Sequence, residues 1–235
     1  SQGAFALRVR ADLLGLSGEE ALYVLDAEGR ASFGPYTAQD ASAKGTWLPT
    51  TLGDAVVLAL HSTHPYCPLM RIETVSHFYK SIFNGGTATS LSCNIPINSE
   101  TNPDALQVAT GVGILIIPYG TGQGFCTGTL LTTQTPVEPV PESYLLSSWH
   151  CLDSSNDYTG MEVFWDYRSE SDDPNVLLRN QGAQLLSHNE ILDAALMRLD
   201  DPVAVGPHGR AWVGWDTLRP EVGDHPNRAL SQGGQ

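Results

Sequence analysis

Residues that could act together in catalysis occur in three short stretches of the second half of the chain. His150 follows an apolar run in LLSSWHC and directly precedes Cys151. Cys126 lies in the small-residue stretch GFCTGTLL, and Asp193 opens DAALMRLD. A carboxylate that accepts a hydrogen bond from the Nδ1–H of an imidazole fixes its tautomer and stabilises the imidazolium. These stretches therefore predict His150 as a general base and Asp193 as its orienting acid.

Each of these residues alone has a plainer interpretation. A lone histidine is usually a satisfied polar residue, and an aspartate before a strand usually belongs to a turn. The ordered combination of a strand cysteine, His-Cys and Asp-Ala-Ala-Leu is far rarer by chance than any one member. A bridge between Cys126 and Cys151 would pin the turn that carries His150, whereas Trp149 is expected to fill core space.

Composition limits the partners of the chain. Its 235 residues are 41% hydrophobic and 16% charged, which is typical of a globular protein with a real core. The net charge of −14 argues against nucleic acid, because proteins that bind it neutralise phosphates with Lys and Arg. No apolar run approaches the roughly 18–20 residues that a membrane helix needs, so no membrane partner is expected.

The cysteines indicate the compartment. There are four of them, without a C-x-x-C pair, which fits two disulfides in a secreted or periplasmic protein better than a metal site. His61 and His64 have a spacing that some metal sites use, but no third ligand is near them. The sequence therefore predicts no metal and no cofactor, and any export signal is expected to have been removed already.

Alternating hydrophobicity predicts an all-β fold in two units. Residues 1–80 should form a small β-sandwich from FALRVRADL, ALYVLDAEG, DAVVLALHS and LMRIETVSHFY, with FGPYT as a turn. Residues 81–104 are rich in Gly, Ser, Thr, Asn and Pro, as a linker is. Strand-like runs then resume in GVGILIIPYG, GFCTGTLLTT, SYLLSSW, MEVFWDY, AALMRLD and AWVGWD.

The same stretches carry a family resemblance. GFCTGTLL, LLSSWHC and DAALMRLD resemble first-barrel motifs of the chymotrypsin-like serine proteases, in which a cysteine-bridged turn carries the catalytic histidine. SCNIPIN, VFWDYRS, WVGWD and HPNRAL are similar to the bacterial lysyl endopeptidase branch, and FGPYT and VSHFY resemble its amino-terminal pro-region. The resemblance implies an exported serine endopeptidase, with cleavage after Lys or Arg and a Cys126–Cys151 disulfide. Its substrate would be a peptide or protein.

The implied fold is a chymotrypsin-like double β-barrel behind the amino-terminal sandwich. Residues 105–204 would form the first barrel, and residues 205–235 only the start of the second. The nucleophile is the main departure, because a Gly-x-Ser-Gly turn after Asp193 is missing. GLSGEE precedes His150, and Ser231 lacks the expected context. The chain is therefore expected to be one piece of a larger enzyme, completed by a second polypeptide that carries the rest of the second barrel.

Two alternatives stay open at this point, on the function of the chain and on the pairing of two cysteines. The chain could instead be a non-catalytic, protease-like binding module that has lost its serine. Cys67 and Cys93 could bridge each other, or Cys93 could pair with a cysteine beyond this chain. The leading unit is expected to pack on the protease unit and to cover its cleft until cleavage, with Lys80 as one possible cleavage position.

Overall fold

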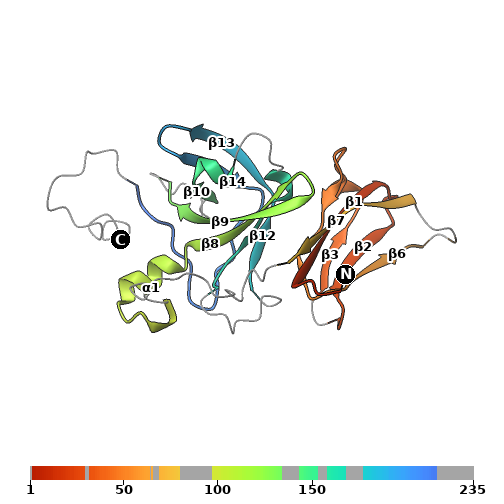
Figure 1. Ribbon diagram of the computed structural model, residues 1–235, viewed down its shortest axis with the longest axis horizontal. Helices are drawn as coiled ribbons and strands as arrows, with labels where there is room; N and C mark the ends of the chain where they lie inside the picture. The colour runs from red at the N-terminus through yellow and green to blue at the C-terminus, as the bar shows by residue number, and fades with distance from the viewer. Residues whose placement is uncertain are drawn as a thin grey trace.

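The computed structural model describes residues 2–29, 32–63, 65, 69–79, 97–133, 143–152, 158–167 and 177–215. They form two units, a leading unit coloured red to orange and a second unit coloured green to blue (Figure 1). Within these residues, no helix has the length and apolar character needed to cross a membrane. The predictions that concern His64, Cys67, Lys80, Cys93 and Ser231 lie outside the described residues.

The leading unit is a pair of small antiparallel sheets around a shared core. In the first sheet, β1 (Ala6–Gly15) pairs along its length with β7 (Leu69–Phe78), and also with β4 (Thr46–Trp47) and β5 (Thr51–Leu52). The second sheet has the order β3 (Ser32–Tyr36), β2 (Ala21–Asp26) and β6 (Val56–His61). Alternate apolar residues of these strands form the core, namely Val9, Ala11, Leu13, Leu22 and Val24, with Leu48.

Two strands of these sheets depart from regular pairing, β7 and β3. Among the described residues β7 pairs only with β1, so it is an edge strand, and its register shifts at Glu73. The predicted FGPYT turn is wrong, because these residues belong largely to β3. Gly34 permits this arrangement, since a Cβ there would lie 2.7 Å from the carbonyl oxygen of Leu22. A glycine and a proline inside a strand read as a turn when seen from the sequence alone.

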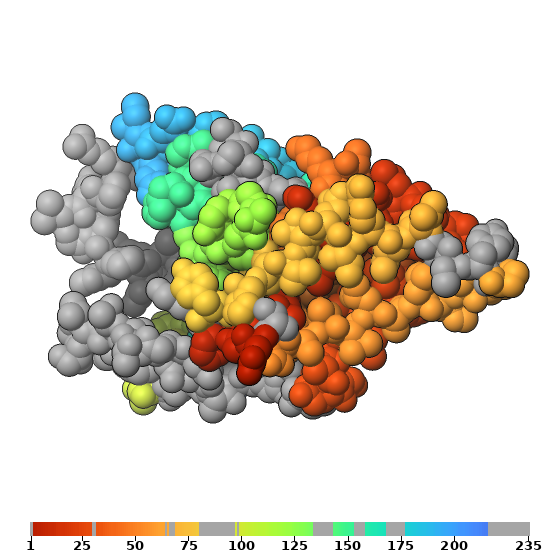
Figure 2. Space-filling model, turned by 45° about the vertical axis from the view of Figure 1, so that its right-hand side comes forward, coloured from red at the N-terminus to blue at the C-terminus, as the bar shows by residue number. Residues whose placement is uncertain are grey.

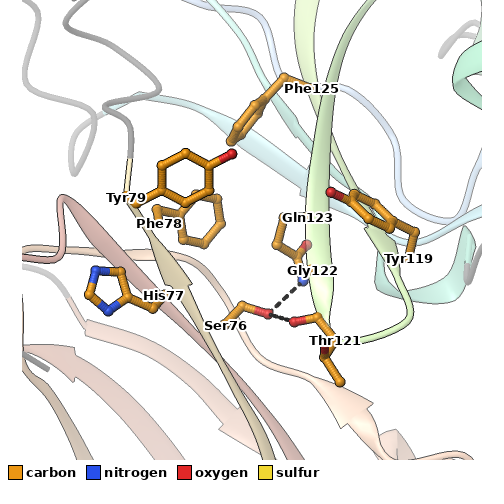
Figure 3. A pocket seen from close by; sticks show the side chains of 9 residues that line it. All are labelled: Ser76, His77, Phe78, Tyr79, Tyr119, Thr121, Gly122, Gln123 and Phe125. Carbon is orange, nitrogen blue, oxygen red and sulfur yellow. Dashed lines mark hydrogen bonds between the residues drawn. The ribbon is translucent and has the colours of Figure 1, made fainter.

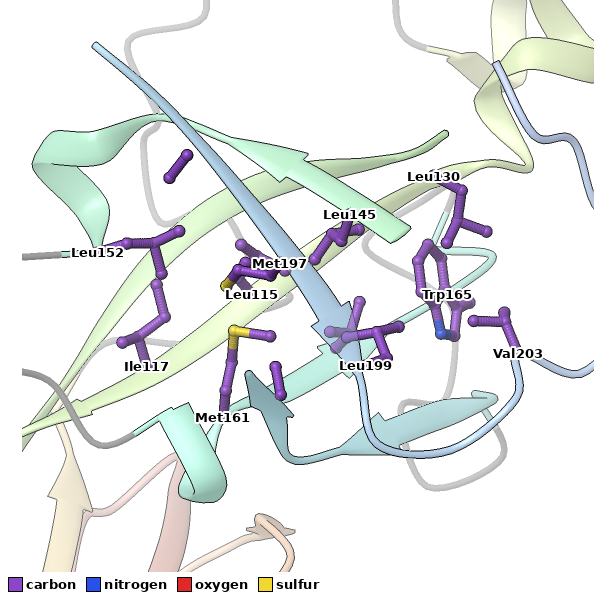
Figure 4. Packing of buried hydrophobic residues seen from close by; sticks show 13 residues of the cluster. Leu115, Ile117, Leu130, Leu145, Leu152, Met161, Trp165, Met197, Leu199 and Val203 are labelled. Atoms are coloured by element: carbon purple, nitrogen blue, oxygen red, sulfur yellow. The ribbon is translucent and has the colours of Figure 1, made fainter. Parts of the chain in front are cut away.

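The second unit is one seven-stranded antiparallel sheet that curls into a half-barrel. Its order is β12 (Arg179–Gln181), β11 (Glu162–Phe164), β8 (Val112–Tyr119), β9 (Gly122–Leu131), β10 (Tyr144–Ser147), β14 (Ala194–Leu199) and β13 (Ala183–Asn189). Inward-facing residues fill its core (Figure 4), among them Leu115, Ile117, Leu145, Met161, Trp165 and Met197. Period-two alternation explains this core, since Leu145 is fully buried whereas Leu146 is 40% exposed.

The described residues contain this half-barrel but no second barrel. The AWVGWD stretch, predicted as a strand, contributes only an isolated bridge between Val213 and Leu131. The helix α1 (Pro103–Ala109) was not predicted, and it begins where the linker was expected to end. Its start has ordinary capping chemistry, because the Asn102 side chain accepts from the backbone N–H of Asp104 at 3.0 Å. Short 3-10 turns complete the described elements: η1 (Ala38–Asp40), η2 (Ile97–Ser99), η3 (Trp149–Cys151) and η4 (Tyr158–Gly160).

A buried carboxylate joins the two units. Glu162 on β11 is fully buried, and both of its oxygens lie 3.1 Å from the backbone N–H of Thr50 in the leading unit. Arg8 Nε lies 3.4 Å from one oxygen, and Arg179 Nη1 lies 3.3 Å from the other. Because Arg8 also comes from the leading unit, the charge of Glu162 is balanced across the interface.

Aromatic rings enclose the same cluster. The Arg179 guanidinium lies between Phe33 of the leading unit and Phe164 of the half-barrel, 4.4 Å and 4.3 Å from their ring centroids. A planar guanidinium stacks well on such faces. An apolar cluster continues the interface, since Ala6 and Phe78 pack with residues of β8 and β11.

A polar chain extends the interface to the β8–β9 hairpin. The Ser76 hydroxyl donates to the Thr121 carbonyl at 2.9 Å and accepts from the Gln123 amide at 3.2 Å (Figure 3). Arg8 Nη1 donates to the other atom of that amide at 3.1 Å. The yellow end of β7 therefore lies against the green hairpin on the surface (Figure 2). A pocket at this junction is lined by Ser76, His77, Phe78, Tyr79, Tyr119, Thr121, Gly122, Gln123 and Phe125.

Candidate active site

Strand order brings the two candidate residues to the same edge of the half-barrel. β10 and β14 are antiparallel neighbours, with Ser147 opposite Ala195. His150 lies just beyond the end of β10, and Asp193 lies just before the start of β14. In an antiparallel pair, the end of one strand lies beside the start of its neighbour, at the same end of the half-barrel. Residues that are distant in sequence thus become neighbours.

The Asp193 carboxylate binds His150 through two contacts. One oxygen accepts from the backbone N–H of His150 at 2.8 Å, and the other lies 2.6 Å from ring atom Nδ1. This geometry holds the imidazole in the tautomer that keeps its proton on Nδ1. Among the described residues no hydrogen bond occupies Nε2, and the imidazole side chain is 70% exposed. The ring is therefore oriented on one side and open on the other.

The backbone of Asp193 is held in an uncommon conformation. Its φ is 49°, in the left-handed region where L-residues with side chains are rare. Aspartate tolerates this region better than most residues because its short polar side chain can bond locally. The turn before β14 thus aims the carboxylate at η3, and aspartate suits both the turn and the contact.

The hydrogen bonds lower the pKa of the Asp193 carboxyl. The backbone N–H of His150 is the largest cause, and the His150 ring is the second. Burial is the third cause and raises the pKa, while the electrostatic interaction with His150 and the Trp149 backbone N–H lower it by less. Donors to the ionised form stabilise it. Asp193 therefore stays ionised, as an orienting carboxylate must.

The disulfide implied by the family resemblance is confirmed. Cys126 on β9 is bonded to Cys151 at the end of η3, with 6.3 Å between their Cα atoms. β9 pairs with β10, with Thr129 opposite Leu146, so the earlier residues of β9 run alongside the turn that follows β10. The bridge fixes that turn, and with it His150, to the neighbouring strand.

The leading unit does not cover this pair in the described residues. Its hydrogen bonds and ion pairs to the half-barrel involve β11, β12 and the β8–β9 hairpin. The side chains of His150 and Asp193 are 70% and 48% exposed. The pair is thus accessible to a substrate or to another segment of protein.

One neighbouring residue escaped the sequence analysis. His188 on β13 stacks on Trp149, with ring centroids 3.8 Å apart and 15° between the planes. Trp149 also packs against the half-barrel core, as expected of a core-filling residue. The signal that could have found His188 is its place on the strand that forms a hairpin with β14, on the other side of the turn from Asp193.

Metal binding finds little support at this edge. Cys126, His150 and Cys151 are the only described group of three close ligand-type residues, and both of these sulfurs are used in the disulfide. A disulfide sulfur is not the thiolate that coordinates metals. His61 is exposed on β6, away from that group. The site therefore offers acid–base groups rather than a metal centre.

Comparison with known proteins identifies the half-barrel. No curated protein matches the chain. The family model described as Lysyl endopeptidase, C-terminal domain, matches residues 87–228, a range that contains the half-barrel and both members of the pair. The leading unit lies outside this range. Since the match covers more than half of its residues, the chain belongs to the lysyl endopeptidase C-terminal domain family.

Proposed function

We propose that this chain carries the general base and the orienting carboxylate of an exported serine endopeptidase. His150 is the base and Asp193 orients it. The observation that supports this most is the double contact of the Asp193 carboxylate with the backbone N–H and Nδ1 of His150, at 2.8 Å and 2.6 Å. The same contact leaves Nε2 open for a substrate reaction.

The chemistry follows from the tautomer. With its proton on Nδ1, neutral His150 accepts the proton of a serine hydroxyl at Nε2 while the serine oxygen attacks a peptide carbonyl carbon. Asp193 stabilises the imidazolium that forms. The imidazolium then gives its proton to the leaving amine as the carbon–nitrogen bond breaks, which leaves an acyl-enzyme. Water, activated by the same ring, releases the acid and restores the serine.

The nucleophilic serine is expected outside the described residues. A second barrel would carry it, either on a further part of the same protein or on a second polypeptide. The exposed end of the half-barrel around His150 suits such a partner, because the side chains of His150 and Asp193 are still 70% and 48% exposed to water. Covering the edge would lower the local dielectric and strengthen the pair's electrostatic effect on the reaction.

Two finer features belong to the same proposal. Cleavage after Lys is supported by the family to which the chain belongs, and cleavage after either Lys or Arg is compatible with its net charge of −14. Export to an oxidising compartment is supported by the Cys126–Cys151 disulfide.

The test uses the full-length protein, or this chain combined with the polypeptide that bears the Gly-x-Ser-Gly turn. Hydrolysis of a peptide with a single lysine is measured together with labelling of the serine by a fluorophosphonate. His150→Ala should lower kcat by a factor on the order of 10⁶. Asp193→Asn should lower it by about 10⁴, because an asparagine suits the left-handed turn but does not hold the correct tautomer.

His208→Ala is the matched control, since His208 is an exposed histidine on a turn outside the pair, and it should leave kcat unchanged. The chain alone should show no hydrolysis above background. Normal cleavage by the His150→Ala protein, or efficient cleavage by the isolated chain, would refute the assignment. A completed protein that binds peptides but never cleaves them would instead establish the non-catalytic binding module.

A further inference from the structure

A second contact joins the two segments that carry the candidate pair. Trp149, the residue before His150, stacks on His188 at 3.8 Å between ring centroids. His188 lies opposite Ala195 in the β13–β14 hairpin, whose turn also carries Asp193. The stack and the His150–Asp193 contact therefore connect the same turn, η3, to the same hairpin.

The pair needs such support. Asp193 has a φ of 49°, a conformation that persists only where the surrounding structure determines it. The side chains of His150 and Asp193 are 70% and 48% exposed, so their own packing holds them only in part. The indole of Trp149, in contrast, packs against the half-barrel core as well as against His188. Trp149 thus links the half-barrel core to His188 on the β13–β14 hairpin.

We propose that His188 is a positioning residue for His150. By stacking on Trp149 it holds the β13–β14 hairpin against η3, so that the Asp193 carboxylate meets both the backbone N–H and Nδ1 of His150. Functional sites depend on neighbours whose own orientation is locked by packing. The effect on catalysis rests on the proposed function, whereas the effect on the His150–Asp193 contact is a property of this chain alone.

The contact can be observed directly by proton NMR of the chain. The proton between Nδ1 and a carboxylate resonates far downfield, and its exchange with water reports how often the contact opens. His188→Ala should increase that exchange rate roughly 2- to 10-fold, the factor that an aromatic pair contributes beyond buried area. His188→Phe keeps a stacking ring and should restore the original rate.

His208→Ala removes an exposed imidazole on a turn outside the β13–β14 hairpin and serves as the matched control. His188 is itself exposed, so its truncation should leave the chain folded. A purely structural role would lower the melting temperature without changing the exchange rate of the His150 proton. That result would overturn the proposal. So would an exchange rate of the His150 proton in His188→Phe that is as fast as in His188→Ala.

The completed enzyme separates this inference from the proposed function. There, His188→Ala should lower kcat by a similar factor with KM unchanged, because the substrate contacts are intact and only the base is displaced. If the NMR effect is present but the completed protein has no hydrolase activity, the proposed function fails and the positioning role stands. If the completed protein is active and His188→Ala changes neither the proton exchange rate nor kcat, the positioning role fails and the proposed function stands.

Discussion

Two carboxylates, Glu162 and Asp193, bind cationic or ring partners in opposite surroundings. Glu162 is fully buried between the units and contacts Arg8, Arg179 and the backbone of Thr50. Asp193 is 48% exposed at the edge of the half-barrel, and its hydrogen-bond donors come from η3.

The difference in solvent exposure separates their roles. A buried charge is tolerated only when it is fully paired, so Glu162 fixes the relative placement of the segments that supply its partners. An exposed pair contributes little to stability, because water screens it. Asp193 is therefore better suited to orienting His150 than to holding the fold. Glu162 therefore stabilises the contact between the two units, whereas Asp193 orients the His150 ring.

The largest expected effect on stability is at the buried carboxylate. Glu162→Ala leaves the charges of Arg8 and Arg179 without their shared partner and should lower the free energy of unfolding by about 3–5 kcal/mol. Urea denaturation measures this. Glu190→Ala, which removes an exposed carboxylate from the hairpin turn, should stay within about 0.5 kcal/mol of the parent. If both variants lost the same free energy of unfolding, the expectation that the buried carboxylate contributes more to stability than the exposed one would be wrong.

Removing the disulfide should lower the free energy of unfolding by a similar or smaller amount, and it should also change the NMR signal of the His150 proton. Replacing Cys126 and Cys151 by serine opens a loop with a sequence separation of 25 and should cost about 3.5 kcal/mol in the chain-entropy account. Because the bridge fixes η3, this variant should also broaden the downfield His150 proton. The Glu162→Ala variant, in the still-folded chain, should leave that proton sharp. A sharp signal in the cysteine variant would show that the bridge does not hold the pair.

The smallest expected effect is the change with pH in the stability that the Asp193–His150 contact contributes. The pKa of Asp193 is lowered, so the free energy that its contact with His150 contributes is fully present above the ordinary aspartate pKa of about 3.9 and is lost as the pH falls through the lower folded value. Carbon NMR of the carboxyl group during an acid titration checks this. In His150→Ala the backbone N–H remains, so the pKa should stay below the ordinary value but rise relative to the parent. A carboxyl that titrates as in the urea-unfolded chain would contradict the contact.

The contact between His150 and Asp193 could be predicted because its signals are local. Each member lies at the end of an apolar strand, and the order of cysteine, histidine and aspartate motifs is visible in the sequence. The strands β1, β2, β6 to β11 and β14 were predicted because the sequence shows strand-like apolar runs there. The half-barrel follows from those runs, whereas a second barrel is absent from the described residues.

The interface could not be predicted, because its partners are far apart in the chain. Thr50 and Glu162, for example, are separated by 112 residues. In FALRVRADL, Arg8 has the position of a solvent-facing residue, and it is fully buried only because the half-barrel covers that face of β1. The strands β12 and β13 were missed as well. Their residues RNQ and AQLLSHN lack the regular alternation of the predicted strands.

The edge position that β7 has among the described residues has a consequence for self-association. A free strand edge is a template on which a second molecule can add a strand, and β7 exposes apolar side chains at Leu69, Ile72 and Val75. The same strand carries Arg71 and Glu73, which lie 3.4 Å apart as an ion pair, and its register is interrupted beside them. Charges and a bulge on an edge disfavour the flat, continuous pairing that fibrils require. β7 thus contains its own protection against polymerisation at high concentration.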